Sequence, residues 1–458
     1  MRLFEQEIDI PVKDADVPIS YLERAVLDRL SPDRIPVRLA VTQGDRQTWH
    51  CELGVLEGMD DPAGVRPASI FEFMPRKAEN TGKFTAVLLV PTGIGAEIGG
   101  HAGDAGPVAR LLASTCDTLI THPNVVNASD INELPENGLY VEGSVIARLL
   151  MGTVGLQKVR SNRVCLVIDQ HQDPRICELV INAASAARAT LGLECPFVVK
   201  LDPPIRMWGE YSSSSRAVGR VDGLERLCEV LSRRRTEFDA VALGSVIDVP
   251  ERLQYDYYKS HGEIVNPWGG VEAMLTHAIS LMFDVPSAHA PMVESMEILN
   301  RDVGVVDPRM SAEVISGSFL YSVLKGLYRS PRIVRDATVL NLPGVLTAAD
   351  VSCLVIPDGC VGLPTLAALE QGIPVVAVRE NRNRMRNDLE ALPFAPGKLF
   401  VVNNYLEAVG VMTALKAGVA VPSVRRPLAE TIVSSESAEQ AGVAQAGVEL
   451  QRAILDPL

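Results

Sequence analysis

The sequence predicts an α/β fold with mostly parallel sheets, and three observations support this. Short apolar runs that suit buried strands recur along the chain, such as 86–90 and 164–169. A loop follows each run, and then comes a segment with apolar residues at helical spacing, most clearly at 174–191. Strands that alternate with helices favour a parallel sheet covered on both faces. We therefore expect two Rossmann-like units joined by a connecting helical segment.

The same patterns divide the chain into five parts. The first contains two predicted strands, and the last is Ala-rich and helical in pattern. The predicted parts are an N-terminal strand-containing region (1–85), a first Rossmann-like unit (86–248), a long loop and helical segment (249–334), a second Rossmann-like unit (335–405) and a C-terminal helical tail (406–458).

Two long segments between the predicted strands are interpreted as loops. Residues 206–221 contain four consecutive serines and are predicted to form a mobile loop. Residues 249–270 contain several aromatic residues and end in the turn Asn266-Pro-Trp-Gly-Gly270. Loops of this length inside a compact domain are usually lids or binding loops. A helix is predicted at 311–327, and 434–447 is predicted to be loosely held.

Composition restricts the partners. The net charge of −14 argues against nucleic acid, because binding the phosphate backbone needs a basic face. The eight cysteines form no CxxC pair and are expected to be buried thiols. No secretory signal is recognised and no apolar run is long enough to span a bilayer, so we expect a cytoplasmic protein without a membrane partner. A small-molecule substrate is expected, and homo-oligomer formation stays open.

A glycine-rich loop follows the first strand of the predicted site. Glycines there let backbone N–H groups approach an anion, and the helix that follows adds a favourable dipole. The spacing is not the dinucleotide-binding pattern, which Ile98 interrupts, and no Gly-Lys-Ser/Thr of a P-loop is present. The loop predicts binding of a phosphate or carboxylate, with a tight structural turn as the alternative. The predicted ligand-binding residues are Thr92, Gly93, Gly95, Gly99 and Gly100.

Polar residues cluster in this loop and after the next strand. His101, Asp104 and His122 are candidate catalytic residues, because a histidine and a carboxylate can act as acid and base. Asn124 and Asn127 are candidate ligand-binding residues, and a divalent cation such as Mg²⁺ would accept their oxygens. As an alternative, Asp104 caps a helix and the asparagines form turns. Two later histidines have different predicted roles. His289 is a candidate site residue, whereas His277 is expected in the core.

A second turn combines Asp358, Gly359, Cys360 and Gly362. Cys360 would lie between a strand and a helix N-terminus, an environment that lowers a thiol pKa and favours a nucleophile or base. The turn is similar to the second-half cysteine turn of the aspartate/glutamate and hydantoin racemases. Those enzymes use two cysteines, and the first glycine-rich loop of this chain lacks the other one.

A basic stretch follows the next strand and includes Arg379 and Asn381. Its arginines are candidate clamps for a phosphate or carboxylate, with a solvated surface as the alternative. The helix, Gly-x-Pro-Val, strand and basic segment look like the second domain of UDP-N-acetylglucosamine 2-epimerases. In those enzymes the corresponding turn and strand end hold the nucleotide. We expect a cleft where the glycine-rich loop, the segment 122–130 and the turn 358–362 meet.

Four stretches together resemble one whole-length family of bacteria, cyanobacteria and plastid-bearing lineages, known as a domain of unknown function. They are VPTGIGAEIGGHAGDAGP, LITHPNVVNASDINE, NPWGGVEA and DGCVGLPTLAALEQGIPVVAVREN. The resemblance implies soluble proteins of the cytoplasm or plastid stroma and carries no activity. From the residues we expect an enzyme acting on a small anionic metabolite at the glycine-rich loop. The alternatives are a racemase or isomerase using Cys360, and a non-catalytic sensor or assembly subunit.

Overall fold

The computed structural model describes residues 1–12, 18–59, 67–431 and 433. Residues 1–416 form one compact unit, which contains all the sheets and the candidate site. The described part of the second unit, which begins at Ala417, contains a short 3-10 helix at Val421–Val424. The predicted tail at 434–447 lies outside the described residues.

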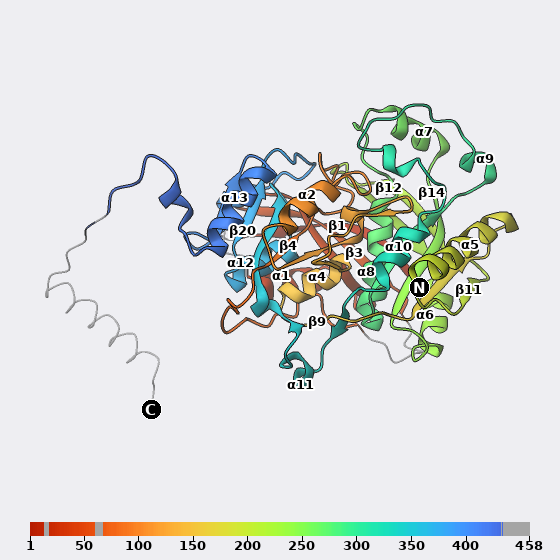
Figure 1. The fold of residues 1–458 in the computed structure, drawn as a ribbon, viewed down its shortest axis with the longest axis horizontal. Helices are drawn as coiled ribbons and strands as arrows, with labels where there is room; N and C mark the ends of the chain where they lie inside the picture. The colour runs from red at the N-terminus through yellow and green to blue at the C-terminus, as the bar shows by residue number, and fades with distance from the viewer. Residues whose placement is uncertain (13–17, 60–66, 432, 434–458) are drawn as a thin grey trace. The chain divides into compact units, whose positions relative to one another are not determined.

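All neighbouring strands are parallel in a six-stranded sheet, which Figure 1 shows in part. The candidate site described below lies at the carboxyl edge of this sheet. The central strands of the sheet contain only buried residues, as expected for a sheet covered on both faces. In spatial order the strands are β21 (Leu399–Val402), β20 (Val375–Val378), β18 (Val351–Pro357), β4 (Thr85–Leu88), β5 (Thr118–Thr121) and β8 (Gly138–Tyr140).

This sheet combines strands from both of the predicted Rossmann-like units. Strands of both predicted units pair with each other, because β4 lies directly beside β18. The Thr85 N–H also donates to the Ser352 hydroxyl at 3.2 Å, across 267 residues of sequence. The order of connection reverses between β4 and β18, and the loops after such strands diverge to leave a crevice.

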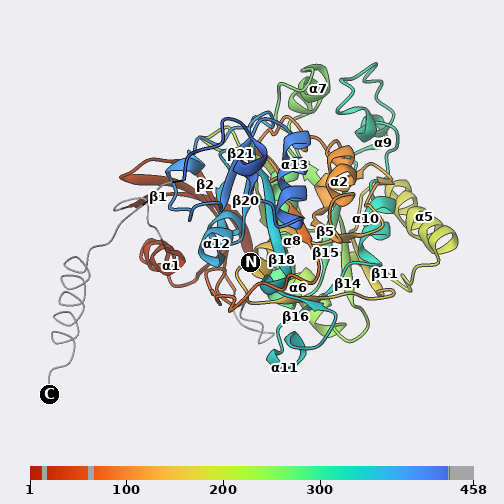
Figure 2. The same ribbon diagram turned by 60° about the vertical axis from the view of Figure 1, so that its left-hand side comes forward.

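Helices cover the six-stranded sheet in two packed pairs. α2 (Gly106–Ala113) contacts α13 (Tyr405–Lys416), and α4 (Gly143–Leu150) contacts α12 (Leu363–Gln371). Figure 2 shows α12 and α13 on opposite sides of β20. The apolar faces of these helices are buried, which accounts for the helical spacing of apolar residues in the sequence.

The second sheet has ten strands and is mixed. Four parallel strands form one side of this sheet, and the other side is largely antiparallel. α8 (Gly269–Phe283) and α10 (Leu320–Leu327) contact its parallel part, and α5 (Pro174–Leu191) contacts α10. α6 (Leu224–Arg233) lies between two strands of this sheet in chain order. The parallel strands are β11 (Val198–Leu201), β10 (Val164–Asp169), β14 (Ala240–Asp248) and β15 (Ser287–Met292). The remaining strands are β12 (Arg206–Tyr211), β13 (Ala217–Asp222), β1 (Arg2–Pro11), β3 (Thr48–Glu57), β2 (Arg34–Gly44) and β19 (Val361–Gly362).

The prediction of a mobile loop at 206–221 is wrong, because this segment forms the β12–β13 hairpin. The four consecutive serines form the turn of this hairpin, in which the Ser212 N–H donates to the Arg216 carbonyl at 2.9 Å. Strand β13 also pairs with β1 from the N-terminus, and β12 pairs with β14. The hairpin is thus held by partners that are distant in the sequence.

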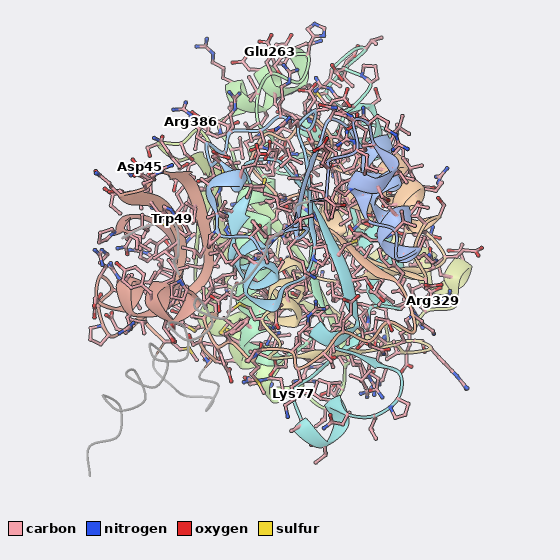
Figure 3. The ribbon with its side chains drawn as sticks, turned by 90° about the vertical axis from the view of Figure 1, so that its left-hand side faces the viewer. Asp45, Trp49, Lys77, Glu263, Arg329 and Arg386 are labelled. Atoms are coloured by element: carbon pink, nitrogen blue, oxygen red, sulfur yellow. The ribbon has the colours of Figure 1, made fainter. Side chains whose placement is uncertain are left out.

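The N-terminal β2–β3 hairpin also contacts the segment after β20. Figure 3 labels Asp45 and Trp49 in this hairpin and shows Arg386 close to it. The Arg386 N–H donates to the Thr42 carbonyl at 2.8 Å, and β19 pairs with β2. Because β19 leads directly into α12, these contacts bring the antiparallel strands to the carboxyl edge of the six-stranded sheet.

A small lobe is built from residues 249–268 and 293–319. It contains α7 (Glu251–Lys259) and α9 (Met296–Leu299), which lie together at the top of Figures 1 and 2. Tyr257, Val306 and Met310 form its buried apolar core. The single helix predicted at 311–327 is wrong: a 3-10 turn at Ser311–Glu313 and α10 are separated by irregular chain.

All eight cysteines are buried and unpaired, as expected from their apolar surroundings.

Shorter elements complete the described fold. The short elements are α1 (Ile19–Leu27), α3 (Pro123–Val126), α11 (Ala337–Leu340), β6 (Asn127–Ala128), β7 (Ile131–Asn132), β9 (Gly155–Gln157), β16 (Arg332–Val334) and β17 (Val345–Leu346), with 3-10 turns at Ala348–Asp350 and Leu389–Ala391.

Candidate functional site

A cavity of about 610 Å³ lies at the carboxyl edge of the six-stranded sheet. Its walls come from the loops after β4, β5, β8 and β18, from α8, from β2 and from the lobe. This volume is within the range of small-molecule and cofactor sites. Strand order explains the position, since the crevice between β4 and β18 opens into it.

The cavity brings together some of the sequence-predicted site residues and leaves others outside its lining. The first group comes from the ends of three neighbouring strands, and the second lies within the loops behind them. Thr92, His122, Asn124, Asn127, Cys360 and Gly362 line the cavity, whereas Gly93, Gly95, Gly99, Gly100, His101, Asp104, Asp358, Gly359, Arg379 and Asn381 do not.

The glycine-rich loop uses several of its backbone donors within the protein. The N–H of Gly99 donates to Asp104 Oδ1 at 2.6 Å, and the N–H of Ile98 donates to Asn381 Oδ1 at 2.8 Å. Gly93 has a φ of +82°, and a Cβ there would lie 2.6 Å from the Ala217 carbonyl oxygen. These glycines therefore serve the close packing of the loop, which is the alternative stated for the sequence.

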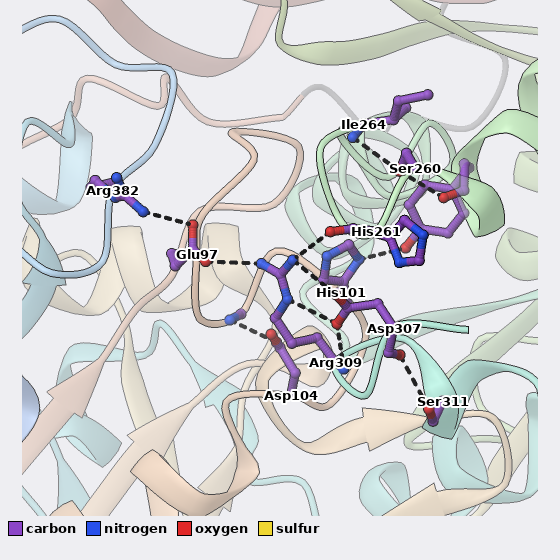
Figure 4. A network of polar contacts seen from close by, with 12 residues as sticks. Glu97, His101, Asp104, Ser260, His261, Ile264, Asp307, Arg309, Ser311 and Arg382 are labelled. Atoms are coloured by element: carbon purple, nitrogen blue, oxygen red, sulfur yellow. Dashed lines mark hydrogen bonds and ion pairs between the residues drawn. The ribbon is translucent and has the colours of Figure 1, made fainter. Parts of the chain in front are cut away.

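His101 belongs to a clasp between this loop and the lobe, drawn in part in Figure 4. Its Nδ1 lies 2.7 Å from the Tyr257 hydroxyl, which donates to Glu313 Oε2 at 3.0 Å. Burial and the nearby Arg309 lower the pKa of His101 to about 4. Arg309 also donates to Glu97 Oε1 at 3.0 Å, as Figure 4 shows. The contacts of His101 thus lie behind the cavity wall.

Asp104 lies in the same loop and is also occupied by the protein. Burial raises its pKa to about 8, although the N–H of Gly99 opposes the shift. Asn124 lines the cavity but donates to the Gly99 carbonyl at 3.0 Å. Asn127 donates to the Tyr140 hydroxyl at 2.6 Å. These side chains shape the loops around the cavity.

The arginines after β20 do not converge on the cavity. Arg379 is 53% exposed and pairs with Glu390 at 3.3 Å and with Asp358 at 3.9 Å. Asn381 is fully buried and donates to the Ile98 carbonyl and to the Tyr405 hydroxyl. This segment therefore fastens the glycine-rich loop and presents its arginines to solvent.

Cys360 lines the cavity, but the expected lowering of its thiol pKa is wrong. Its side chain is buried at the start of the turn into α12. Burial, and secondarily the Asp358 carboxylate, raise the pKa of the Cys360 thiol well above its usual value. A thiolate is disfavoured at this position, because desolvation acts against the charged form.

His122 follows β5 and faces the cavity as a neutral ring. Its Nε2 accepts from the N–H of Val90 at 3.2 Å, which assigns the ring proton to Nδ1. Burial lowers its pKa to about 4, despite the opposing charge of Glu142. Among the described residues no acceptor lies within hydrogen-bonding distance of this Nδ1, so the N–H is available to a ligand.

A carboxylate–imidazole pair, Glu142 and His277, lies in the same wall. Glu142 follows β8 and caps α4, where its Oε2 accepts from the Ser144 N–H at 2.9 Å. Its Oε1 contacts Nδ1 of His277, which comes from α8. Burial acts to raise the pKa of Glu142, but His277 and Ser144 outweigh it and the pKa is lowered. The prediction of His277 as a core residue is wrong, since its ring lines the cavity.

A second pair on α8 joins Glu272 to His289. Glu272 Oε1 accepts from His289 Nδ1 at 2.8 Å, and His289 Nε2 lies 2.7 Å from the Ser245 hydroxyl. His289 is on β15 and Ser245 on the neighbouring β14. Glu272 and His289 both line the cavity, and His289 was a candidate in the sequence.

Buried charges from the antiparallel strands lie beside these pairs. Arg216 contacts Glu5 at 2.7 Å and Glu52 at 2.9 Å, and Arg38 contacts Glu5 at 3.2 Å. Burial raises the pKa of Glu5, against the effect of Arg38, and the pKa of Glu52, against the effect of the Ser214 hydroxyl. Both arginines line the cavity, so this network gives the wall on that side a polar lining of balanced charge.

The helices α4, α8 and α12 begin at the cavity, as does the short α3. The N-terminal residues Gly143 of α4, Gly269 of α8 and Leu363 of α12 all line it. Glu142 caps α4, and Asn266 Oδ1 accepts from the N–H of Gly269 at 3.2 Å. The first turn of α12 has no side-chain cap. Pro364 in this turn has no N–H, and the other N–H groups of the turn and the helix dipole favour an anion.

Neither a metal cluster nor a membrane-spanning helix was found in the described ranges. Residues 1–12, 18–59, 67–431 and 433 contain no group of three or more His, Cys, Asp or Glu side chains arranged to hold a metal ion. Across the same ranges no helix combines the length and apolar character needed to cross a membrane.

Residues 85–425 match the family described as "Protein of unknown function (DUF3326)". The chain belongs to the DUF3326 family. This confirms the resemblance to a whole-length family that is known as a domain of unknown function. A relative from Synechococcus sp. described as an uncharacterized lipoprotein is 37% identical over 342 residues, which cover 73% of this chain and 91% of that protein. No solved structure matches the chain.

The DUF3326 match covers most of the polar residues of the cavity. It begins at β4 and includes His122, Glu142, Glu272 and His277, whereas Arg38 precedes it. Sequence reasoning missed both glutamates. A signal was present for Glu142, because an acid two residues after a strand and directly before a helix suits a cap. Glu272 lies in the helix turn after the capping Asn266 and gave no such signal.

Proposed function

We propose that this protein is an enzyme that transfers protons on a small metabolite carrying a carboxylate or phosphate. The observation that supports this proposal is the Glu142–His277 pair, which shares one cavity wall with His122. A histidine backed by a carboxylate is a common general acid and base, because the carboxylate fixes the ring orientation and stabilises its charged form.

In this mechanism Glu142 orients His277 through Nδ1 and leaves Nε2 to face the substrate. Glu142 is suited to this role because its lowered pKa keeps it ionised. Nε2 of His277 takes a proton from the substrate, and negative charge develops on a substrate oxygen. The neutral His122 donates its Nδ1–H to that oxygen, as preorganised donors do in many enzymes.

We assign the anionic group of the substrate to the N-terminus of α12. Gly362, Leu363 and Thr365 line the cavity there, and no side chain caps the helix. The site follows β18, where the strand order reverses, and ligands of Rossmann-like sheets bind at such a point. This assignment replaces the glycine-rich loop as the anion site, because two backbone donors of that loop are already used by Asp104 and Asn381.

Two alternatives from the sequence have less support. A racemase or isomerase using Cys360 needs a thiolate, and burial raises the pKa of this thiol. A non-catalytic sensor would use the same cavity but needs no ionised glutamate behind a histidine. The cytoplasmic location stays a prediction, and the description of the Synechococcus relative as a lipoprotein is a statement about that protein.

Deuterium incorporation from solvent tests the proposed function. The full chain is incubated in D₂O with a panel of 2-hydroxy acids, 2-keto acids, amino acids and sugar phosphates, and mass spectrometry reads the label. We expect the wild type to label at least one compound. His277→Gln should lower the rate about a hundredfold or more, the usual contribution of general acid–base catalysis.

His50→Gln is the matched control. His50 pairs with Asp9 at 2.6 Å, but this pair lies on the surface, and His50 is 48% exposed. The control should label at the wild-type rate. Equal rates for wild type and His277→Gln would contradict the proposal. A compound that raises the melting temperature without taking up deuterium would support the sensor alternative.

A further inference from the structure

Ser245, His289 and Glu272 are the residue types of a hydrolytic triad, but their order relative to the cavity is reversed. A nucleophilic serine must meet the substrate, with the carboxylate behind the histidine. Here Ser245 is 1% exposed and is absent from the cavity lining, whereas the Glu272 side chain is 24% exposed and lines it. The Ser245 hydroxyl also contacts Met207 Sδ at 2.9 Å. The group presented to a ligand is therefore the carboxylate.

Two contacts orient this carboxylate. Glu272 Oε1 accepts from His289 Nδ1, and His289 Nε2 faces the Ser245 hydroxyl, so the ring is held at both nitrogens. The His289 side chain is 1% exposed and is fixed between β14, β15 and α8. Glu272 Oε2 is then the carboxylate oxygen that is left to contact a ligand in the cavity. The carboxylate also lies in the first turn of α8, where the helix dipole stabilises an anionic side chain.

Glu272 and His277 are five residues apart on one helix, and both line the cavity. A rise of about 1.5 Å per residue separates them by about 7.5 Å along the helix axis. A substrate of about seven heavy atoms in a row spans this distance, because three bonds of an extended chain cover about 3.8 Å. The two groups therefore reach different positions of one bound molecule.

We propose that Glu272 is a second proton-transfer residue of this cavity and that the reaction is an isomerisation. This inference rests on the proposed function, in which His277 is the first such residue. Glu272 and His277 contact the substrate and are catalytic, whereas His289 and Ser245 act through Glu272 and are positioning residues.

The chemistry balances without an external reagent. One group takes a proton from the first position of the substrate, and the bonding electron pair enters the conjugated system of the substrate. The other group, which is protonated at the start, gives its proton to the second position. The substrate keeps its composition, and the two groups have exchanged protonation states, which solvent then restores.

Position-resolved labelling tests this inference, with solvent deuterium as the probe. The full chain, Glu272→Gln and His277→Gln are incubated in D₂O with the panel of hydroxy acids, keto acids, amino acids and sugar phosphates. Proton NMR then reads which positions lose signal. The wild type should label two positions of one compound. In each variant the rate of deuterium labelling should fall at least tenfold at one position, and the affected position should differ between the two variants.

Three further variants separate catalysis from folding. Ser245→Ala and His289→Gln should slow labelling only at the position that depends on Glu272, because a merely structural role would slow both. Glu133→Gln is the control, since Glu133 is an exposed carboxylate paired with Arg110 at 2.9 Å and lies outside the cavity lining. It should label as the wild type does.

The possible failures are distinguishable. A wild type that labels no compound overturns the proposed function and this inference with it. A wild type that labels two positions, with both retained in Glu272→Gln, overturns this inference alone. Labelling of one position only in the wild type also contradicts the isomerisation, while the role of His277 stands.

Discussion

The two histidine–glutamate pairs on α8 are alike in composition and opposite in orientation. In the first pair Glu142 is 3% exposed and His277 is 15% exposed. In the second pair His289 is 1% exposed and Glu272 is 24% exposed. The first pair therefore presents an imidazole to the cavity, and the second presents a carboxylate.

The elements behind each pair explain this difference. The N-terminus of α4 supplies N–H and hydroxyl donors at Ser144, so a carboxylate can be buried there. Strands β14 and β15 supply the Ser245 hydroxyl, which bonds an imidazole nitrogen and leaves the carboxylate outside. The partner that is buried is the one whose remaining polar atoms the local backbone and side chains can satisfy.

The largest effect is expected for removing the buried carboxylate of the first pair. Glu142→Ala leaves His277 and the Ser144 donors without their acceptor in a buried wall. Breaking a buried pair by deleting one partner costs about 3 to 5 kcal/mol. Urea unfolding should therefore show a much lower midpoint for the variant.

The exposed pair Asp9–His50 provides the matched control for that measurement. Asp9 is 68% exposed, and exposed ion pairs contribute little to stability. Asp9→Ala should leave the urea midpoint nearly unchanged. A loss for Glu142→Ala no larger than that for Asp9→Ala would show that Glu142 is not buried in solution, and the comparison would fail.

A smaller effect is expected for the second pair. Glu272→Ala removes one hydrogen bond from a charged acceptor that is partly exposed to the cavity. Such a bond contributes about 1.5 to 3 kcal/mol when buried, and partial exposure reduces the value to about 1 kcal/mol. The urea midpoint should fall less than in Glu142→Ala. An equal or larger fall would contradict the opposite orientation of the two pairs.

A pH dependence distinguishes the surroundings of the two pairs. Burial, and to a lesser extent Glu272, raise the pKa of Glu313 from 4.5 to about 7. This raised pKa contributes stability that is fully present below pH 4.5 and is lost as the pH rises towards 7. The pH dependence of the Glu142 contribution has the opposite sign, because the pKa of Glu142 is lowered on folding. Its contribution to stability is present above the pKa of the unfolded state and is lost as the pH falls through the pKa of the folded state.

Melting temperatures of wild type and Glu313→Gln between pH 4.5 and 7 measure this effect. The wild type should lose stability relative to the variant as the pH rises across this window, since glutamine does not titrate. Glu272→Gln should reduce the difference by removing a neighbouring charge. Parallel curves for wild type and Glu313→Gln would show that the clasp holds an ordinary carboxylate.

Local structure was largely predictable, and pairing was not. Helix α5 and strand β10 have the expected limits, because apolar periodicity is a property of adjacent residues. The partners of a strand depend on residues far along the chain. This is why the β12–β13 hairpin was taken for a loop and why β4 and β18 were assigned to different units.

The candidate site shows the same limit. Sequence reasoning found His122 and Gly362 because each follows a strand at a turn. It predicted anion binding at the glycine-rich loop, and composition does not reveal that Asp104 and Asn381 occupy two backbone donors of that loop. It placed His277 in the core, since a histidine within an apolar helix gives no sign of a carboxylate arriving from α4.

The pairing of β4 with β18 has a consequence for biosynthesis. During translation β4, β5 and β8 emerge early, but the partner of the inner edge of β4 follows only after more than two hundred further residues, as the 267-residue separation of Thr85 and Ser352 shows. Until then an apolar strand edge is open to other chains. The chain therefore depends on late closure of its central sheet, and nascent or truncated forms are expected to need chaperones to stay monomeric.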